Sequence, residues 1–279
     1  MLLGAHVSIS GTIDRAVDRA RELKCTTFQL FTRNPRGWKA KKLKKEEIEE
    51  FKRKMKEYGY GLAVSHMPYL PNISSPLIQT YKKSLSSLIE ELERAGELSL
   101  KYLVVHIGSH LGKGLDIGIK KAAESVNTAL SKVNNDVVVL LENMAGQRNS
   151  VGSRFEDIKR ILNLIEYPDR VGVCFDTCHA FAAGYDLRTR EAIENTLRDF
   201  DEIIGLRLLK AVHINDSKGD LGSHLDRHEH IGMGKIGENG FRELFHNKYI
   251  RDLPLILETP VDSRGNFATN LAKCRELYI

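Results

Sequence analysis

The stretch DVVVLLEN, Asp136–Asn143, is an apolar run that ends in two polar residues. Its length and β-branched content favour a strand, and the absence of polar alternation indicates that both faces of this strand are covered. The chain contains seven further runs of this kind: Leu2–Val7, Thr26–Phe31, Gly61–His66, Tyr102–Ile107, Val171–Asp176, Leu208–Asn215 and Leu253–Thr259. The sequence therefore predicts eight strands of a parallel sheet.

Amphipathic segments with helical spacing separate most of these strands. They cover residues 11–23, 76–98, 118–133, 154–165 and 190–204. Eight strand–helix units predict an α/β fold, a (β/α)8 TIM barrel, rather than an open doubly wound sheet. Because no linker or break in composition interrupts the chain, we expect residues 1–279 to form a single catalytic domain. Its active site should lie at the C-terminal ends of the strands.

The overall composition excludes several classes of protein. No run of 18 apolar residues occurs and the first residues do not resemble a signal peptide, so we expect a cytoplasmic protein without a membrane partner. The four cysteines show no CxxC spacing, which predicts reduced thiols. Cys174 and Cys178 lie near His179, but we expect both thiols to be buried structural groups rather than zinc ligands.

Six of the eight predicted strands end in a residue that can bind a metal ion. These residues are His66, His106, Glu142, Asp176, His213 and Glu258. A single histidine or acid at a strand end is usually a core residue or a helix cap. Six of them at the rim where barrel enzymes build their sites point instead to a metal centre.

Loops add three more candidate ligands, His179, Asp226 and His228, which makes nine. Imidazoles and carboxylates together suit zinc, and also manganese or iron. Because one ion takes only three or four protein ligands, nine donors predict more than one ion. A pair of ions is the usual device for phosphodiester hydrolysis, and the late loop would position a third.

We expect the remaining histidines to lie outside the metal set. His110, His224, His230 and His246 should be exposed, and His6 should line the pocket without holding metal. The glycines of HIGMGKIGENG, His230–Gly240, do not match a phosphate-binding loop and are interpreted as turn residues that could allow a close backbone approach.

A basic segment with the only tryptophan, Trp38, runs from Arg33 to Lys56. Most of it has the spacing of a solvated helix. Arg33, Arg36 and Lys39 precede that helix and are the candidates for contact with a phosphate backbone.

At these residues the chain resembles the endonuclease IV family of abasic-site (AP) endonucleases. The matching segments are GAHVS (Gly4–Ser8), FTRNPRGW (Phe31–Trp38), HIGSH (His106–His110), LEN (Leu141–Asn143), VGVCFDTCHAFAAGYDLRT (Val171–Thr189), HINDSK (His213–Lys218), DRHEHIG (Asp226–Gly232) and LET (Leu257–Thr259). The chain has Ile107 where the family commonly has proline, which leaves the ligand pattern intact.

The resemblance implies a DNA repair hydrolase of the deoxyribonuclease IV (phage-T4-induced) type with three Zn2+ ions, at some of which Mn2+ or Fe2+ is acceptable. It implies that water activated by the trinuclear metal centre hydrolyses the phosphodiester 5′ to an abasic site, leaving a 3′-hydroxyl and a 5′-deoxyribose phosphate. Trimming of blocked 3′ ends is also implied. The implied ligand sets are His66, His106 and Glu142; Glu142, Asp176, His213 and Glu258; and His179, Asp226 and His228. Glu142 bridges two ions and orients the water.

The resemblance also implies the partner, double-stranded DNA that contains abasic sites or blocked 3′ ends. Arg36, Tyr69 and Leu70 would enter the duplex at the lesion. A nucleoid-associated monomer is expected. Two other classes stay open: a metal-dependent sugar isomerase or epimerase, which needs fewer ions, and a lesion-binding protein whose metals are structural.

Overall fold

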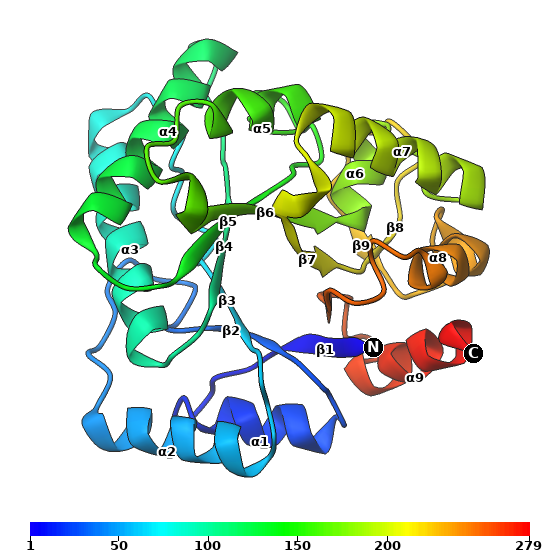
Figure 1. Cartoon of the computed structure of the whole chain (residues 1–279), viewed down its shortest axis with the longest axis horizontal. Helices are drawn as coiled ribbons and strands as arrows, with labels where there is room; N and C mark the ends of the chain where they lie inside the picture. Colours follow the sequence, from blue (N-terminus) through cyan, green and yellow to red (C-terminus); the bar gives the residue numbers. More distant parts are fainter.

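The computed structural model describes residues 1–279 and forms a closed barrel of eight parallel strands (Figure 1). The strands are β1 (Leu2–Val7), β2 (Gln29–Phe31), β3 (Val64–His66), β4 (Tyr102–His106), β5 (Val138–Glu142), β6 (Val171–Asp176), β7 (Leu209–His213) and β10 (Pro254–Leu257). Their order around the barrel is β1-β10-β7-β6-β5-β4-β3-β2. The predicted (β/α)8 TIM barrel is confirmed, and each strand falls inside its predicted run.

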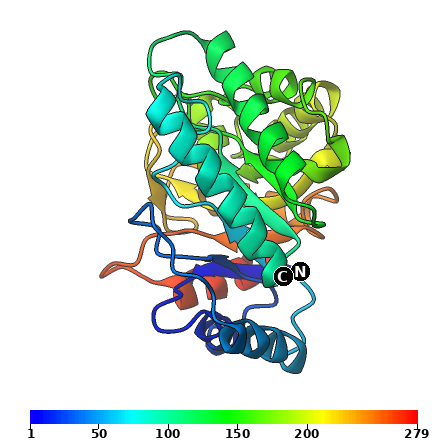
Figure 2. The ribbon, with the colours of Figure 1, turned by 90° about the vertical axis from the view of Figure 1, so that its left-hand side faces the viewer.

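Helices surround the barrel. They are α1 (Arg15–Glu22), α2 (Lys45–Glu57), α3 (Ile78–Glu97), α4 (Leu115–Lys132), α5 (Phe155–Leu162), α6 (Thr177–Ala183), α7 (Arg190–Ile203), α8 (Gly237–His246) and α9 (Phe267–Tyr278). Figure 2 shows α3 and α4 side by side along one flank. None of these helices combines the length and apolar character that a membrane span requires.

Three elements were not anticipated from the sequence: α6, α8 and α9. A two-stranded antiparallel hairpin, β8 (Asp216–Ser217) with β9 (His228–Glu229), was also missed. These strands are two residues long, so they carry no periodic signal. The hairpin matters for the site because it fixes the base of the loop that holds Asp226.

The core has two layers. A large apolar cluster fills the space between strands and helices, and a small one fills the barrel interior: Val64, Tyr102, Val104, Leu140, Cys174 and Ala211. Burial of each large apolar side chain in this interior contributes about 1.5–3 kcal/mol to stability. Polar side chains fill the interior at the C-terminal ends of the strands.

Strand β1 needs a glycine at position 4. A Cβ atom there would lie 1.8 Å from the carbonyl oxygen of Thr27, so only glycine allows this close approach. On the same strands, His6 and Gln29 are register partners. The close approach of the two segments precedes the pairing that places His6 of β1 beside Gln29, the first residue of β2.

Candidate metal centre

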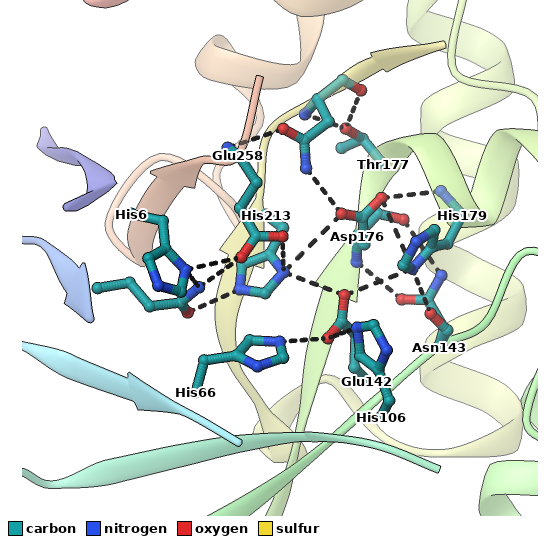
Figure 3. Close-up of polar contacts among 12 residues, drawn as sticks. His6, His66, His106, Glu142, Asn143, Asp176, Thr177, His179, His213 and Glu258 are labelled. Atoms are coloured by element: carbon teal, nitrogen blue, oxygen red, sulfur yellow. Dashed lines mark hydrogen bonds and ion pairs between the residues drawn. The ribbon is translucent and has the colours of Figure 1, made fainter. Parts of the chain in front are cut away.

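The strand-end donors converge inside the C-terminal mouth of the barrel (Figure 3). Four groups each have one donor atom per residue, all within 4.8 Å of one another, and three of the groups consist only of predicted ligands. These three are His66, Glu142 and His213; Glu142, Asp176, His213 and Glu258; and His179, Asp226 and His228. Glu142 belongs to two of the groups, and His106 joins them through its contact with Glu142. The nine residues predicted from the sequence therefore meet in one place.

Glu142 is the centre of the first expected ligand set. Its side chain is fully buried, and its Oε2 atom lies 3.1 Å from Nε2 of His66 and 3.1 Å from Nε2 of His106. His106, at the end of β4, is the more exposed of the two rings. Because both imidazoles meet the same oxygen, a cation bound there would share this carboxylate with the neighbouring group.

Glu142 and Glu258 are carboxylates at neutral pH. Burial alone favours the neutral acids, but the facing imidazoles outweigh it, with His213 prominent at both groups, and hold the pKa of each well below its ordinary value. The fully buried Asp176 adds a third acidic side chain in the same group. Such a concentration of buried acidic groups needs positive charge beside it.

The imidazoles are oriented by hydrogen bonds to backbone carbonyls. Nδ1–H of His66 donates to Met67 O at 2.7 Å. Nδ1–H of His179 donates to Asn143 O at 2.9 Å, and Nδ1–H of His228 to Glu258 O at 3.1 Å. A carbonyl only accepts, so each ring carries hydrogen on Nδ1 and turns Nε2 toward the acids, which is the usual outer contact of a metal-bound histidine.

The surroundings of Nε2 of His228 show whether these residues fit a metal ion. This atom is buried without a hydrogen-bond partner. It lies 3.6 Å from Oδ1 of Asp226 and 3.8 Å from Oδ2 of Asp176, which is too far for a hydrogen bond. Two donors on one tetrahedral zinc ion, each about 2.1 Å from it, lie roughly 3.4 Å apart. The spacing and the orphaned nitrogen fit a cation.

Without a metal ion, protonated imidazoles supply the positive charge beside the acids. Burial favours the neutral ring of His179, but Asp176, Asp226 and other acids outweigh it and hold its pKa well above the ordinary value. The pKa of His213 is likewise well above its ordinary value, against the effect of burial, because Cys174, Glu258 and Glu142 face it. The site is therefore built around charges that cations would neutralise.

Two asparagines, not predicted from the sequence, hold Asp176 in place. Nδ2 of Asn215 donates to Oδ2 of Asp176 at 2.8 Å, and the backbone N–H of Asp176 donates to Oδ1 of Asn143 at 2.8 Å. Oδ1 of Asn215 also accepts from the backbone of Glu258 at 2.9 Å. Asn143 directly follows Glu142 in LEN, and Asn215 lies two residues after His213 in HIN, which is the signal that could have identified them.

The glycine-rich segment after β9 wraps around Asp216. Its buried carboxylate accepts backbone N–H groups from Ser217, Gly232, Gly234, Ile236 and Gly237. A Cβ atom on Gly234 would lie 2.5 Å from Oδ1 of Asp216. The turn interpretation is therefore right for Gly232 and Gly234 but wrong for Gly237 and Gly240, which lie in α8. The group that this backbone approaches is an internal acid.

The candidate DNA-contact residues divide into two kinds. Arg36, Tyr69 and Leu70 are exposed. Arg33 is buried: its Nε atom donates to Glu91 at 2.6 Å, and its Nη1 atom donates to the carbonyls of Gly37 and Trp38. The expectation that Arg33 contacts phosphate is therefore wrong, and this side chain instead shapes the loop that presents Arg36.

The other histidines and the cysteines mostly agree with expectation. His224 and His246 are exposed and His110 is partly exposed, but His230 is buried against Asp262 and Asn270, so its predicted exposure is wrong. The missed signal is its place directly after β9.

Cys174 and Cys178 are buried, and burial raises their pKa values to about 11 and about 12. Sγ of Cys178 lies near Asp176 and His228, as part of a fourth group of possible metal donors.

Comparison with known proteins identifies the class. Residues 17–277 match the family model described as xylose isomerase-like TIM barrel. A protein of Methanoculleus marisnigri named probable endonuclease 4 is 51% identical over 99% of both chains. The structure of endonuclease IV from Thermus thermophilus is 36% identical, with a TM-score of 0.88 over 99% of this chain and 98% of that one.

The fold and site thus define a xylose isomerase-like TIM-barrel protein with a candidate multi-metal centre. Within that class the chain belongs to the endonuclease IV family and is a nuclease, an enzyme of the hydrolase class. A relative in Plasmodium falciparum, named apurinic-apyrimidinic endonuclease 1, is 42% identical over 92% of this chain, which spans 44% of that protein.

Proposed function

We propose that this chain is a DNA repair enzyme that hydrolyses the phosphodiester 5′ to an abasic site and leaves a 3′-hydroxyl and a 5′-deoxyribose phosphate. The observation that carries the proposal is the convergence of nine donors around Glu142, in a chain whose relatives are named endonuclease 4. The same site would trim blocked 3′ ends, because those ends present the same phosphodiester chemistry.

Three Zn2+ ions would be held by the three donor sets implied by the family resemblance. When bound, such ions lower the pKa of water and offset the negative charge that develops on the phosphate oxygens. Mn2+ or Fe2+ would be accepted by the same donors. Cys178 is not among the donors that the family resemblance implies.

Glu142 orients the attacking water in this proposal. Its carboxylate is ionised, buried and flanked by His66 and His106, so it accepts a hydrogen bond from a water molecule in a fixed direction. Asn215 keeps the carboxylate of Asp176 from turning away as charge develops, and Asn143 fixes the backbone of Asp176. This preorganisation favours the transition state because the groups do not need to rearrange.

Damage selectivity would come from the cost of rotating a nucleotide out of the duplex. An abasic nucleotide has no base to unstack or unpair, so this cost is lowest at the lesion. Tyr69 and Leu70 expose 66% and 43% of their surface and would fill the gap in the stack. Arg36 would contact the phosphate backbone. The protein is proposed to act as a monomer in the cytoplasm, associated with the nucleoid.

The test is incision of a duplex oligonucleotide with one tetrahydrofuran abasic analogue, without added magnesium, beside an undamaged duplex. Metal content of the same preparation is measured by elemental analysis. Cleavage 5′ to the analogue by protein with about three metals per chain supports the proposal. No cleavage by fully metallated protein overturns it: binding alone indicates a lesion-binding protein, and turnover of a ketose indicates a sugar isomerase.

A further inference from the structure

Gln29 lies in the candidate metal centre, although its side chain is neutral and was not among the predicted ligands. It lies on β2, is fully buried, and reaches across the polar layer to residues from two other strand ends. Its Oε1 atom accepts from Nε2–H of His213 at 2.8 Å. Its Nε2–H group donates to Oε1 of Glu258 at 2.6 Å. Figure 3 shows His213 and Glu258 facing each other beside His6.

The carboxylate of Glu258 decides which way the amide points. A carboxylate only accepts hydrogen bonds, so the amide nitrogen must be the atom 2.6 Å away from it. The reversed amide would put two oxygens at this distance. The second amide hydrogen faces Nδ1 of His6 at 2.9 Å; if Nδ1 accepts it, that nitrogen has no hydrogen for Oε1 of Glu258, which lies 3.2 Å away.

The orientation of Gln29 in turn fixes the hydrogen on His213. Because Oε1 of Gln29 only accepts, Nε2 of His213 must carry a hydrogen. Its other ring nitrogen, Nδ1, then faces the acids: it lies 3.1 Å from Oε1 of Glu142, 3.4 Å from Oε2 of Glu258 and 3.8 Å from Oδ2 of Asp176. A cation in this group would meet Nδ1.

His213 differs from the other histidines in the kind of anchor it has. His66, His179 and His228 are anchored by backbone carbonyls, which no substitution removes. The anchor of His213 is the side chain of Gln29, which a single substitution can delete. A hydrogen bond of this kind to a ligating histidine commonly changes metal affinity by about 10–100-fold.

We propose that Gln29 is a positioning residue of the metal centre, which holds His213 and Glu258 together and presents Nδ1 of His213 to the ion shared with Glu142 and Asp176. This inference rests on the proposed function only in requiring that these donors bind metal. The inference concerns the affinity for the metal ion, so it does not depend on which substrate the enzyme cleaves.

The first test compares the zinc affinity of the wild type, Gln29→Met and Gln79→Met by competition with a chromophoric zinc chelator. Methionine keeps the approximate size of glutamine and removes both hydrogen bonds. Gln79 is exposed on α3, so its variant controls for the same chemical change. We expect Gln29→Met to weaken one zinc site by about 10–100-fold and Gln79→Met to match the wild type. Equal affinity in a folded Gln29→Met protein overturns the inference.

A second measurement needs no variant and so survives a folding defect in Gln29→Met. Long-range 1H–15N NMR of the zinc-loaded wild type reports which nitrogen of His213 carries hydrogen. Hydrogen on Nε2, with a metal-bound shift at Nδ1, supports the role of Gln29, and hydrogen on Nδ1 overturns it. A wild type that binds no zinc overturns the metal centre of the proposed function as well, so the two failures are distinguishable.

Discussion

His106 and Glu142 are register partners on the neighbouring strands β4 and β5, and Nε2 of His106 lies 3.1 Å from Oε2 of Glu142. The contact is therefore set by backbone pairing rather than by flexible loops. Asp176 and His213 are also register partners, on β6 and β7. Four donors are therefore placed by the pairing of neighbouring strands. The strand ladder thus preorganises the centre of the site.

Glu142→Gln is expected to abolish incision while the barrel stays folded. The amide keeps the shape of the side chain but removes the charge that faces His66 and His106, so the rate should fall by about 10³-fold or more. The measurement is single-turnover cleavage of the abasic-analogue duplex, with thermal melting of the same sample. Glu166→Gln, at an exposed position, is the control. Near-normal cleavage by folded Glu142→Gln would remove Glu142 from the mechanism.

Metal removal is expected to destabilise the fold. Ions that bind only the native chain stabilise it by about 4 kcal/mol at a thousandfold excess over Kd, which corresponds to a melting shift of roughly 10 °C. Calorimetry before and after dialysis against a chelator, with zinc restored in a third sample, measures this. Identical melting temperatures in all three samples would contradict metal binding at the buried donors.

Arg36→Ala is expected to weaken binding to duplex DNA. Loss of one phosphate contact lowers the slope of log K against log salt by about one unit. Fluorescence anisotropy over a salt series gives the slope. Lys56→Ala is the matched control because Lys56 lies beside Gly61–Ala63, which precede β3 at the opposite end of the barrel. An unchanged slope for Arg36→Ala would exclude this phosphate contact.

Asp216→Ala is expected to destabilise the protein by about 3–5 kcal/mol, because five backbone N–H groups lose their acceptor. Asp216→Asn keeps one oxygen and should lose less. Asp220→Ala is the control in the same loop, since Asp220 is exposed. Chemical denaturation measures all three free energies of unfolding. A loss for Asp216→Ala no larger than for Asp220→Ala would show that the loop holds without this carboxylate.

Lys54→Met is expected to destabilise the protein at neutral pH and to have little effect on its stability at acid pH. Nζ of Lys54 lies 2.7 Å from Oδ2 of Asp14. Burial favours the neutral acid, but hydrogen bonds from Lys54 and Thr12 outweigh it and lower the pKa of Asp14. The stabilisation is therefore complete above about pH 4 and is lost as pH falls through the lower folded pKa.

We expect a destabilisation of about 1–3 kcal/mol at pH 7 that shrinks below pH 4. Urea unfolding of Lys54→Met and the wild type over a pH series measures it. Lys52→Met, at an exposed site on the same helix, provides the control. A constant difference across this range would refute the linkage to Asp14.

Much of the architecture could be predicted because buried parallel strands leave continuous apolar runs, of which DVVVLLEN is the clearest. The donors at the strand ends were predictable for the same reason. Arg33 and His230 were misjudged because sequence shows the charge of a side chain but not the buried partner, Glu91 or Asp262, that satisfies it. Gln29 was missed because its role depends on His213, which is remote in sequence.

The pairing of β1 with β10 has a consequence for synthesis. Leu2 pairs with Pro254, so β1, the first barrel strand to be made, lies beside β10, the last barrel strand. Glu258 follows β10 directly, whereas His66 has been in place for most of translation. The chain must hold its exposed strand edges for nearly the whole of its synthesis before the barrel closes. The donor group of Glu142, Asp176, His213 and Glu258 can therefore assemble only once β10 has paired with β1.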